Sequence, residues 1–306
     1  MEKFGKVIVK LRIPILILSF LLLIPSAIGY FNTRVNYDIL YYLPNEIETM
    51  QGQDILMDDF NKGAYAMVVV QNMDTKSTDR LIKKVENVDH VAQVISYTGI
   101  VGEDVPSEIV PSKFRKYFEN DSTDTTLFAI FFDNTTSSDD TMNAIIQIRE
   151  QTEGQAFISG MSAVVTDTKN LSEKETPLYV LIAVVLVCIV LAIFMDSFLV
   201  PVFFMISIGM AIVYNLGSNI LLGEVSYITK ALAAVLQLGV TLDYSIFLWH
   251  SYKEMKEIYP DDHKEAMAVA ISNTLTSVVG SSITTVAGFI ALCFMSFTLG
   301  LDLGIV

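Results

Sequence analysis

Cysteine is almost absent from the chain, and both cysteines, Cys188 and Cys293, lie inside apolar runs. A secreted fold held by disulfides would place paired cysteines in polar loops, so that class is excluded. The three histidines, His90, His250 and His263, are scattered, and neither a nucleophile elbow nor a glycine-rich loop ending in GK[ST] occurs. We therefore expect no enzyme, no ATP-driven mechanism, and no cofactor or metal.

Charged residues are also scarce, at 18%, whereas 52% of the residues are hydrophobic. This balance favours a membrane protein over a soluble one. Most of the net charge of -14 belongs to residues 32–176, which hold 24 Asp and Glu against 12 Lys and Arg. The acid either keeps a large water-facing domain soluble or holds a cationic ligand. Nucleic acid is not expected as a partner, because an acidic surface repels it.

Five stretches are long and apolar enough to cross a bilayer as helices, which takes about 20 residues. They cover residues 14–31, 177–195, 198–222, 231–249 and a part of 275–297. Another apolar run begins at Leu299 and stops at Val306. We interpret it as the start of a sixth helix, and the chain as a fragment. The sequence predicts a polytopic α-helical membrane protein.

The first apolar run follows a basic start, formed by Lys3, Lys6, Lys10 and Arg12. A cleaved signal peptide is one interpretation of this pattern, since Ala27-Ile28-Gly29 resembles a cleavage site. Four further spans favour a retained helix at residues 14–31, with residues 1–13 in the cytoplasm by the positive-inside rule.

Several expectations about location follow from this orientation. Residues 32–176 then form an extracytoplasmic domain, and residues 177–306 hold helices 2–5 and the start of helix 6. The expected location is a cell membrane, the bacterial inner or plasma membrane. Residues 250–265 fit a helix that lies on the membrane surface.

The outer segment shows a β-α-β pattern twice. Apolar strand-like runs begin at Ala64, His90, Thr126 and Gln155, and capped amphipathic helices fit residues 77–88 and 137–151. Two such units in succession predict a ferredoxin-like α+β domain. A short helix is expected within residues 105–120. Residues 161–176 predict a polar helix that runs directly into the second span, and we hypothesise that it couples the outer domain to the membrane helices.

Asp243 is the one acidic or basic residue within the five spans. A charged side chain at mid-bilayer costs about 2.5–3.5 kcal/mol on insertion scales, so it is rarely retained without a function. No basic residue of the fragment can reach it at that depth. Burial without a cationic partner disfavours the ionised carboxylate, so we expect Asp243 to exchange a proton. The alternative is a neutral acid that only hydrogen-bonds to another helix.

Small and polar residues surround this position. Tyr244 points about 100° away from Asp243 and should address a neighbouring helix, while Gly239 shares the face of Asp243 and allows close packing. In the fifth span, spacings of three and four form two stripes, Ser277, Ser281 and Thr285 on one and Gly280, Thr284 and Gly288 on the other. The glycines predict close helix packing. Ser281, Thr284 and Thr285 serve packing or a proton relay.

These residues resemble a known family. The stretch GVTLDYSIFLWHSYKE from Gly239 resembles the fourth-helix signature of the MMPL (mycobacterial membrane protein large) branch of the RND (resistance-nodulation-division) superfamily, and SSITTVAGFIAL from Ser281 is similar to its fifth helix. The order of one helix, a porter domain and a helix cluster extends the resemblance over the whole chain. Where family members often have Arg after the aromatic exit, this chain has His250, Ser251 and Tyr252 before Lys253.

The resemblance implies twelve helices in two repeats, with Asp243 and Tyr244 as one of two proton-coupling pairs. It implies export of lipids or other hydrophobic molecules by proton antiport, with the bilayer, protons and the missing C-terminal repeat as partners. Drug-efflux relatives usually carry a double acid in the fourth helix, where this chain has Asp243 and Tyr244. The alternative from another class is a sterol-sensing or receptor-like protein that binds lipid without pumping. The sequence leaves open the substrate, the proton stoichiometry and whether the protein forms a homo-oligomer.

Overall fold

The computed structural model describes residues 2–102, 105, 109–120, 122–152, 154–195 and 199–306. The chain forms two compact units. We call Met1–Asn36 with Lys174–Val306 the membrane unit, and Tyr37–Glu173 the sheet unit. The outer domain that the sequence predicts, residues 32–176, contains the whole sheet unit.

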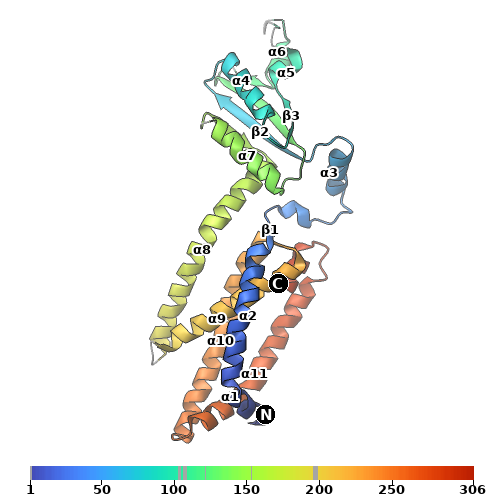
Figure 1. Cartoon of the computed structure of the whole chain (residues 1–306). Coiled ribbons are helices and arrows are strands. Elements are labelled where there is room, and N and C mark those ends of the chain that lie inside the picture. Colours follow the sequence, from blue (N-terminus) through green and yellow to red (C-terminus); the bar gives the residue numbers. More distant parts are fainter. Residues whose placement is uncertain (1, 103–104, 106–108, 121, 153, 196–198) are drawn as a thin grey trace. The chain divides into compact units, whose positions relative to one another are not determined.

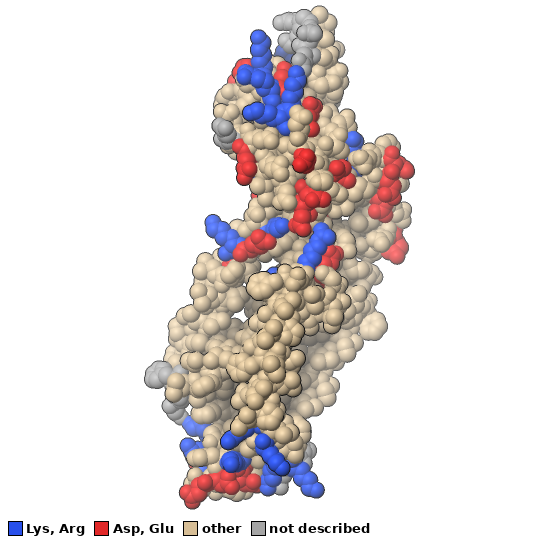
Figure 2. Space-filling model, viewed as in Figure 1, with Lys and Arg blue, Asp and Glu red and all other residues tan. Residues whose placement is uncertain are grey.

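Five helices of the described residues are long and apolar enough to cross a membrane. They are α2 (Arg12–Asn32), α8 (Met161–Phe194), α9 (Leu199–Ser218) with its 3-10 extension η2 (Asn219–Leu222), α10 (Tyr227–Ile258) and α11 (His263–Leu292). All five predicted spans are thus confirmed as helices, although Phe198, the expected first residue of the third, lies outside the described residues. On the face that Figure 2 shows, uncharged residues cover the membrane unit above its basic N-terminal end.

The helix α8 is uninterrupted from the polar residues 161–176 into the second span, as predicted (Figure 1). Pro177 lies inside it. Proline removes one backbone N–H from the helix ladder, a loss that membrane-spanning helices tolerate. The same helix therefore belongs to the sheet unit at its start and to the membrane unit at its end.

One prediction about the membrane surface is corrected by the structure. Residues 250–265 do not form a surface helix, because α10 continues to Ile258 and α11 begins at His263. The basic N-terminal residues, for which no element was predicted, form a separate helix, α1 (Glu2–Lys10). The apolar run from Leu299 forms a short helix, α12 (Leu299–Ile305).

Glycines allow α2 and α9 to pack with their backbones in contact. A Cβ at Gly29 would overlap the carbonyl oxygen of Gly217, and a Cβ at Gly217 would overlap the carbonyl oxygen of Ser26. The hydroxyl of Tyr214 donates a hydrogen bond of 2.6 Å to the carbonyl oxygen of Ser19. Such small-residue contacts are the usual means by which membrane helices approach closely.

We expect Gly217→Val to destabilise the membrane unit by about 1–3 kcal/mol, because the added side chain has to displace the backbone of α2. The thermal unfolding midpoint of the protein in detergent measures this effect. Gly209→Val is the matched control, since Gly209 lies in the same helix and a Cβ there would meet no atom of the described residues within 4 Å. Equal midpoints for the two variants would contradict the assignment of this helix contact.

The sheet unit contains both predicted β-α-β patterns. The first is β2 (Ala64–Gln71), α4 (Thr75–Glu86) and β3 (Val91–Ile95), and the second is β5 (Thr125–Phe132), α7 (Asp139–Thr152) and β6 (Ala156–Ser159). The strand order is β3-β5-β2-β6 with antiparallel neighbours, and β4 (Glu119–Asn120) pairs with β5. The remaining elements are η1 (Ile39–Tyr42), α3 (Glu48–Asp58), α5 (Tyr97–Val101) and α6 (Ser112–Arg115). The helix expected within residues 105–120 is α6, and residues 106–108 lie outside the described residues.

The core of the sheet unit lies between the sheet and the two helices α4 and α7 (Figure 1). Along β5, Phe128, Ile130 and Phe132 are fully buried, and the residues between them are not. This alternation is the period of two that places every second side chain on the same face. On the opposite face, Tyr65 and Phe157 remain exposed.

Candidate functional site

The start of α10 is fixed by side-chain contacts. The hydroxyl of Ser226 accepts a hydrogen bond of 3.2 Å from the backbone N–H of Ile228, which caps the helix. The carboxylate of Asp302 in α12 accepts a hydrogen bond of 2.8 Å from the backbone N–H of Ser226. Just before α10, β7 (Glu224–Ser226) pairs in parallel with β1 (Arg34–Asn36). These contacts set the rotation of α10, and therefore the direction in which Asp243 and Tyr244 point.

Asp243 lies on an exposed face of α10. Its side chain is exposed, and so are Val235, Gly239 and Phe247, which follow one another at intervals of four along the same face. A Cβ at Gly239 would meet no described atom within 4 Å. The close approach predicted beside Gly239 is therefore not made by the described residues of this chain. This face of α10 is available to lipid or to a partner.

The fifth-span glycines are equally open, since a Cβ at Gly280 or Gly288 of α11 would also meet no described atom within 4 Å. Both residues are exposed, as is Thr284 on the same stripe. Their role in close helix packing stays a prediction, and it would require a helix other than the described ones to pack against them.

Tyr244 points in a different direction from Asp243, into a cavity between α10 and α11. The cavity has a volume of about 380 Å³. The Tyr244 side chain faces the hydroxyls of Ser282, Ser281 and Thr285. The helical rotation of 100° between successive residues accounts for this separation of Asp243 from its neighbour.

A row of polar side chains continues from Tyr244 along the cavity wall. Thr241 lies one turn before Tyr244 on α10, and its hydroxyl accepts a hydrogen bond of 3.2 Å from Nε2 of Gln237. The Oε1 atom of Gln237 accepts one of 3.3 Å from Nδ2 of Asn215 on α9. All four side chains line the cavity. In an apolar surrounding, such a row can hold water, because each member can both donate and accept a hydrogen bond.

The hydroxyls of α11 have partners within their own helix. Thr285 Oγ1 donates to the carbonyl oxygen of Ser281 at 3.1 Å, and Thr284 Oγ1 donates to that of Gly280 at 3.1 Å. These bonds leave the oxygen lone pairs free to accept a further hydrogen bond. The structure thus brings Ser281 and Thr285 to Tyr244, and leaves Thr284 on the other stripe.

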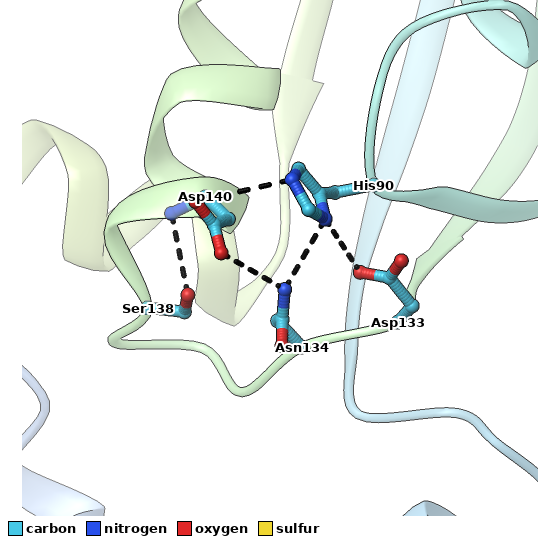
Figure 3. Close-up of polar contacts among 5 residues, drawn as sticks. All are labelled: His90, Asp133, Asn134, Ser138 and Asp140. Atoms are coloured by element: carbon cyan, nitrogen blue, oxygen red, sulfur yellow. Dashed lines mark hydrogen bonds and ion pairs between the residues drawn. The ribbon is translucent and has the colours of Figure 1, made fainter.

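A second polar cluster lies in the sheet unit, between the turn before β3 and the loop after β5 (Figure 3). The His90 ring lies between two carboxylates, with Nδ1 3.2 Å from Asp133 Oδ1 and Nε2 3.9 Å from Asp140 Oδ1. Asn134 Nδ2 donates to Asp140 Oδ2 at 3.2 Å, and Ser138 Oγ accepts from the backbone N–H of Asp140 at 3.2 Å. In the described part of the chain, no group of three or more His, Cys, Asp or Glu side chains is arranged so that it could hold a metal ion. We assign the cluster to joining these two loops.

The chain matches one protein family over most of its length. The family model of MMPL matches residues 42–306, which include most of the sheet unit and the helices α8 to α12. The chain belongs to the MMPL family. MMPL proteins are part of the RND superfamily, so the resemblance seen in residues 239–254 and 281–292 is confirmed.

One relative is a protein of Methanocaldococcus jannaschii, MJ1562, whose name marks it as a suspected membrane protein. It is 23% identical to this chain over 329 residues, covering 95% of the chain and 84% of the relative. Together with the five membrane-length helices, this likeness and the MMPL match identify a multi-pass, transporter-like membrane protein.

The sequence interpretation missed part of the polar cavity of this MMPL chain. Asn215, Gln237, Thr241 and Ser282 were not singled out, although all four line the cavity. A signal was present on α10, because Gln237, Thr241 and Tyr244 recur at spacings of four and three and therefore share a face. No sequence pattern of α9 indicated that Asn215 would meet this face.

Proposed function

We propose that this MMPL chain is a proton-driven transporter that exports lipids or other hydrophobic molecules. The observation that carries the proposal is Asp243, the lone carboxyl group in the apolar part of α10, which is followed by a tyrosine that faces a cavity with a row of polar side chains. A sensor that only binds lipid has no need of a titratable group there, whereas a proton-coupled exporter does.

The proton step centres on Asp243. In its neutral form the carboxyl can stay in an apolar surrounding, and in its ionised form it needs water or a hydrogen-bond donor. Uptake of a proton from the outer side and release to the inner side would change which of these surroundings is favoured. The packing of α10 against its partners would change with it. Tyr244 and the row Thr241, Gln237 and Asn215, which line the cavity on another side of α10, would then change position relative to the neighbouring helices.

The sheet unit is assigned to the outer side of the membrane. The basic N-terminal residues before α2 support this orientation by the positive-inside rule. The repeated β-α-β order and the strand order β3-β5-β2-β6 support a ferredoxin-like porter domain. The uninterrupted helix α8 would transmit movement between this domain and the membrane helices, which opens and closes a path for substrate from the outer leaflet.

We expect another membrane helix to cover the exposed face around Asp243 and Gly239. A charged group and open glycines facing the bilayer are costly unless another helix covers them. Either a second repeat of the same protein or a second copy of this unit can supply that helix.

The proposal is tested by reconstituting the protein in vesicles that contain a fluorescently labelled phospholipid. We expect lipid transport to require a proton gradient, and a gradient of one pH unit to support roughly tenfold accumulation per proton exchanged. A protonophore should stop the transport. Lipid binding without gradient-dependent movement would contradict the transporter and favour the lipid-sensing alternative.

A further inference from the structure

The N-terminal helix α1 packs against the first turns of α11. A Cβ at Gly5 would overlap the carbonyl oxygen of Ala268, so the two backbones are in contact there. Lys6 Nζ lies 2.8 Å from Glu265 Oε1, which pairs the two helices electrostatically. The helix is thus held at one end of the membrane unit, next to the start of α2.

A pocket of about 410 Å³ lies between these elements, and most of its polar lining is basic. The lining residues are Lys6, Val9, Lys10, Arg12, Ile13, Asp262, Lys264, Glu265 and Ala268. Figure 2 shows basic side chains in blue at this end of the membrane unit, beside a group of acidic side chains in red.

Both acids of the pocket already have partners. Glu265 pairs with Lys6, and Asp262 Oδ1 accepts hydrogen bonds of 3.0 Å from the backbone N–H groups of Lys264 and Glu265. The positive charges of Lys10, Arg12 and Lys264 therefore exceed the negative charge that the pocket itself supplies. An anion is the ligand that balances them.

Apolar side chains adjoin the basic ones on the same short stretch of chain. Phe4, Val7, Leu11 and Ile13 are 45–60% exposed. A helix with exposed apolar residues and lysines lies at the boundary between headgroups and acyl chains, with the lysines reaching toward the headgroups. The pocket therefore opens where the phosphate of a lipid would lie, with apolar surface beside it for the acyl chains.

We propose that this pocket binds the phosphate headgroup of an anionic phospholipid, held by Lys10, Arg12 and Lys264. Arginine offers two parallel N–H donors to phosphate oxygens, and lysine adds a mobile point charge. Basic pockets beside membrane helices are suited to anionic headgroups, whose surface potential already attracts them. The bound lipid would fasten α1 and the start of α2 to α11, and this role does not depend on what the protein transports.

Native mass spectrometry of the purified full-length protein tests the proposal. Phosphatidylglycerol and phosphatidylcholine with the same acyl chains are titrated separately, and glycerol 3-phosphate is added as the soluble headgroup. We expect a preference for phosphatidylglycerol, and a loss of about 25-fold in its affinity for Lys10→Gln/Arg12→Gln, since each cation near the surface contributes roughly a factor of five.

The matched control is Lys253→Gln/Lys256→Gln, which removes two charges near the same end of the protein, outside the pocket lining. It should retain the wild-type preference. Lys264→Gln is the second variant, because it leaves untouched the N-terminal charges that orient the first helix, and a loss of about fivefold is expected. Equal binding of the two lipids, equal losses in the pocket and control variants, or full displacement by glycerol 3-phosphate would each overturn the proposal.

Discussion

Replacing Asp243 by Asn is expected to reduce proton-driven lipid transport at least about 100-fold, the scale on which removal of a proton-transfer group slows a reaction. The amide has nearly the same size and can still hydrogen-bond, but it cannot take up or release a proton. The loss should therefore appear in gradient-driven transport in vesicles, with the amount and the thermal unfolding midpoint of the protein unchanged.

Two controls separate proton exchange from general disturbance. Asp243→Glu keeps the carboxyl group and should retain part of the transport rate. Asp261→Asn makes the same chemical change in the exposed turn between α10 and α11, and should transport at the wild-type rate. Full gradient-driven transport by Asp243→Asn would refute the assignment of Asp243, and would leave a structural role in helix contacts as its explanation.

Phe128→Ala should destabilise the sheet unit by about 3–5 kcal/mol, because the variant leaves a cavity in a close-packed core. Phe128 is 0% exposed and lies on the middle of β5, where it faces α4 and α7. Hydrogen exchange of the backbone amides of β2 and β5, followed by mass spectrometry, measures the change. Exchange through unfolding should become faster by about two to four powers of ten.

Phe157→Ala is the matched control for this effect. Phe157 belongs to β6 of the same sheet, but its side chain is 61% exposed on the opposite face. We expect a change below about 0.5 kcal/mol. Similar exchange rates in both variants would show that the buried face of the sheet does not dominate the stability of this unit.

Much of the fold could be predicted because burial imposes a period on the sequence. The bilayer requires uninterrupted apolar stretches, which predicted all five membrane-length helices. In the sheet unit, the apolar run from Ala64 predicted a strand, and β2 confirms it. Which of its faces is buried could not be predicted, because residues 64–70 are apolar on both faces. Local periodicity cannot locate a boundary between two neighbouring helices whose adjoining ends have the same polar composition. The end of α10 and the start of α11 were therefore predicted as a single surface helix.

The helix α1 shows a different limit. Its lysines were interpreted only as a signal for the orientation of the chain in the membrane. The amphipathic pattern formed by Phe4, Val7 and, just beyond the helix, Leu11 was not recognised. The cause of its position is Gly5 against Ala268, a contact between residues more than 260 positions apart. No local pattern reports such a contact.

The candidate site was predictable in part for the same reason. Asp243 stands out because a charge in an apolar helix is costly, and the rotation of Tyr244 away from it follows from helix geometry. The partners of Tyr244 depend on how α9, α10 and α11 are rotated against one another. Asn215 meets Gln237 only through that arrangement, so neither helix indicates the pair by itself.

The short connection between α10 and α11 has a consequence for the register of the site. Only residues 259–262 separate Ile258 from His263, and Asp262 caps the second helix. The number of residues between this turn and Tyr244 on α10, and between the turn and Ser281 on α11, therefore sets whether the two side chains lie at the same level along the helix pair. One residue inserted into the turn can be absorbed there, whereas one inserted between Tyr244 and Ile258 would rotate the tyrosine by about 100° and remove it from the cavity.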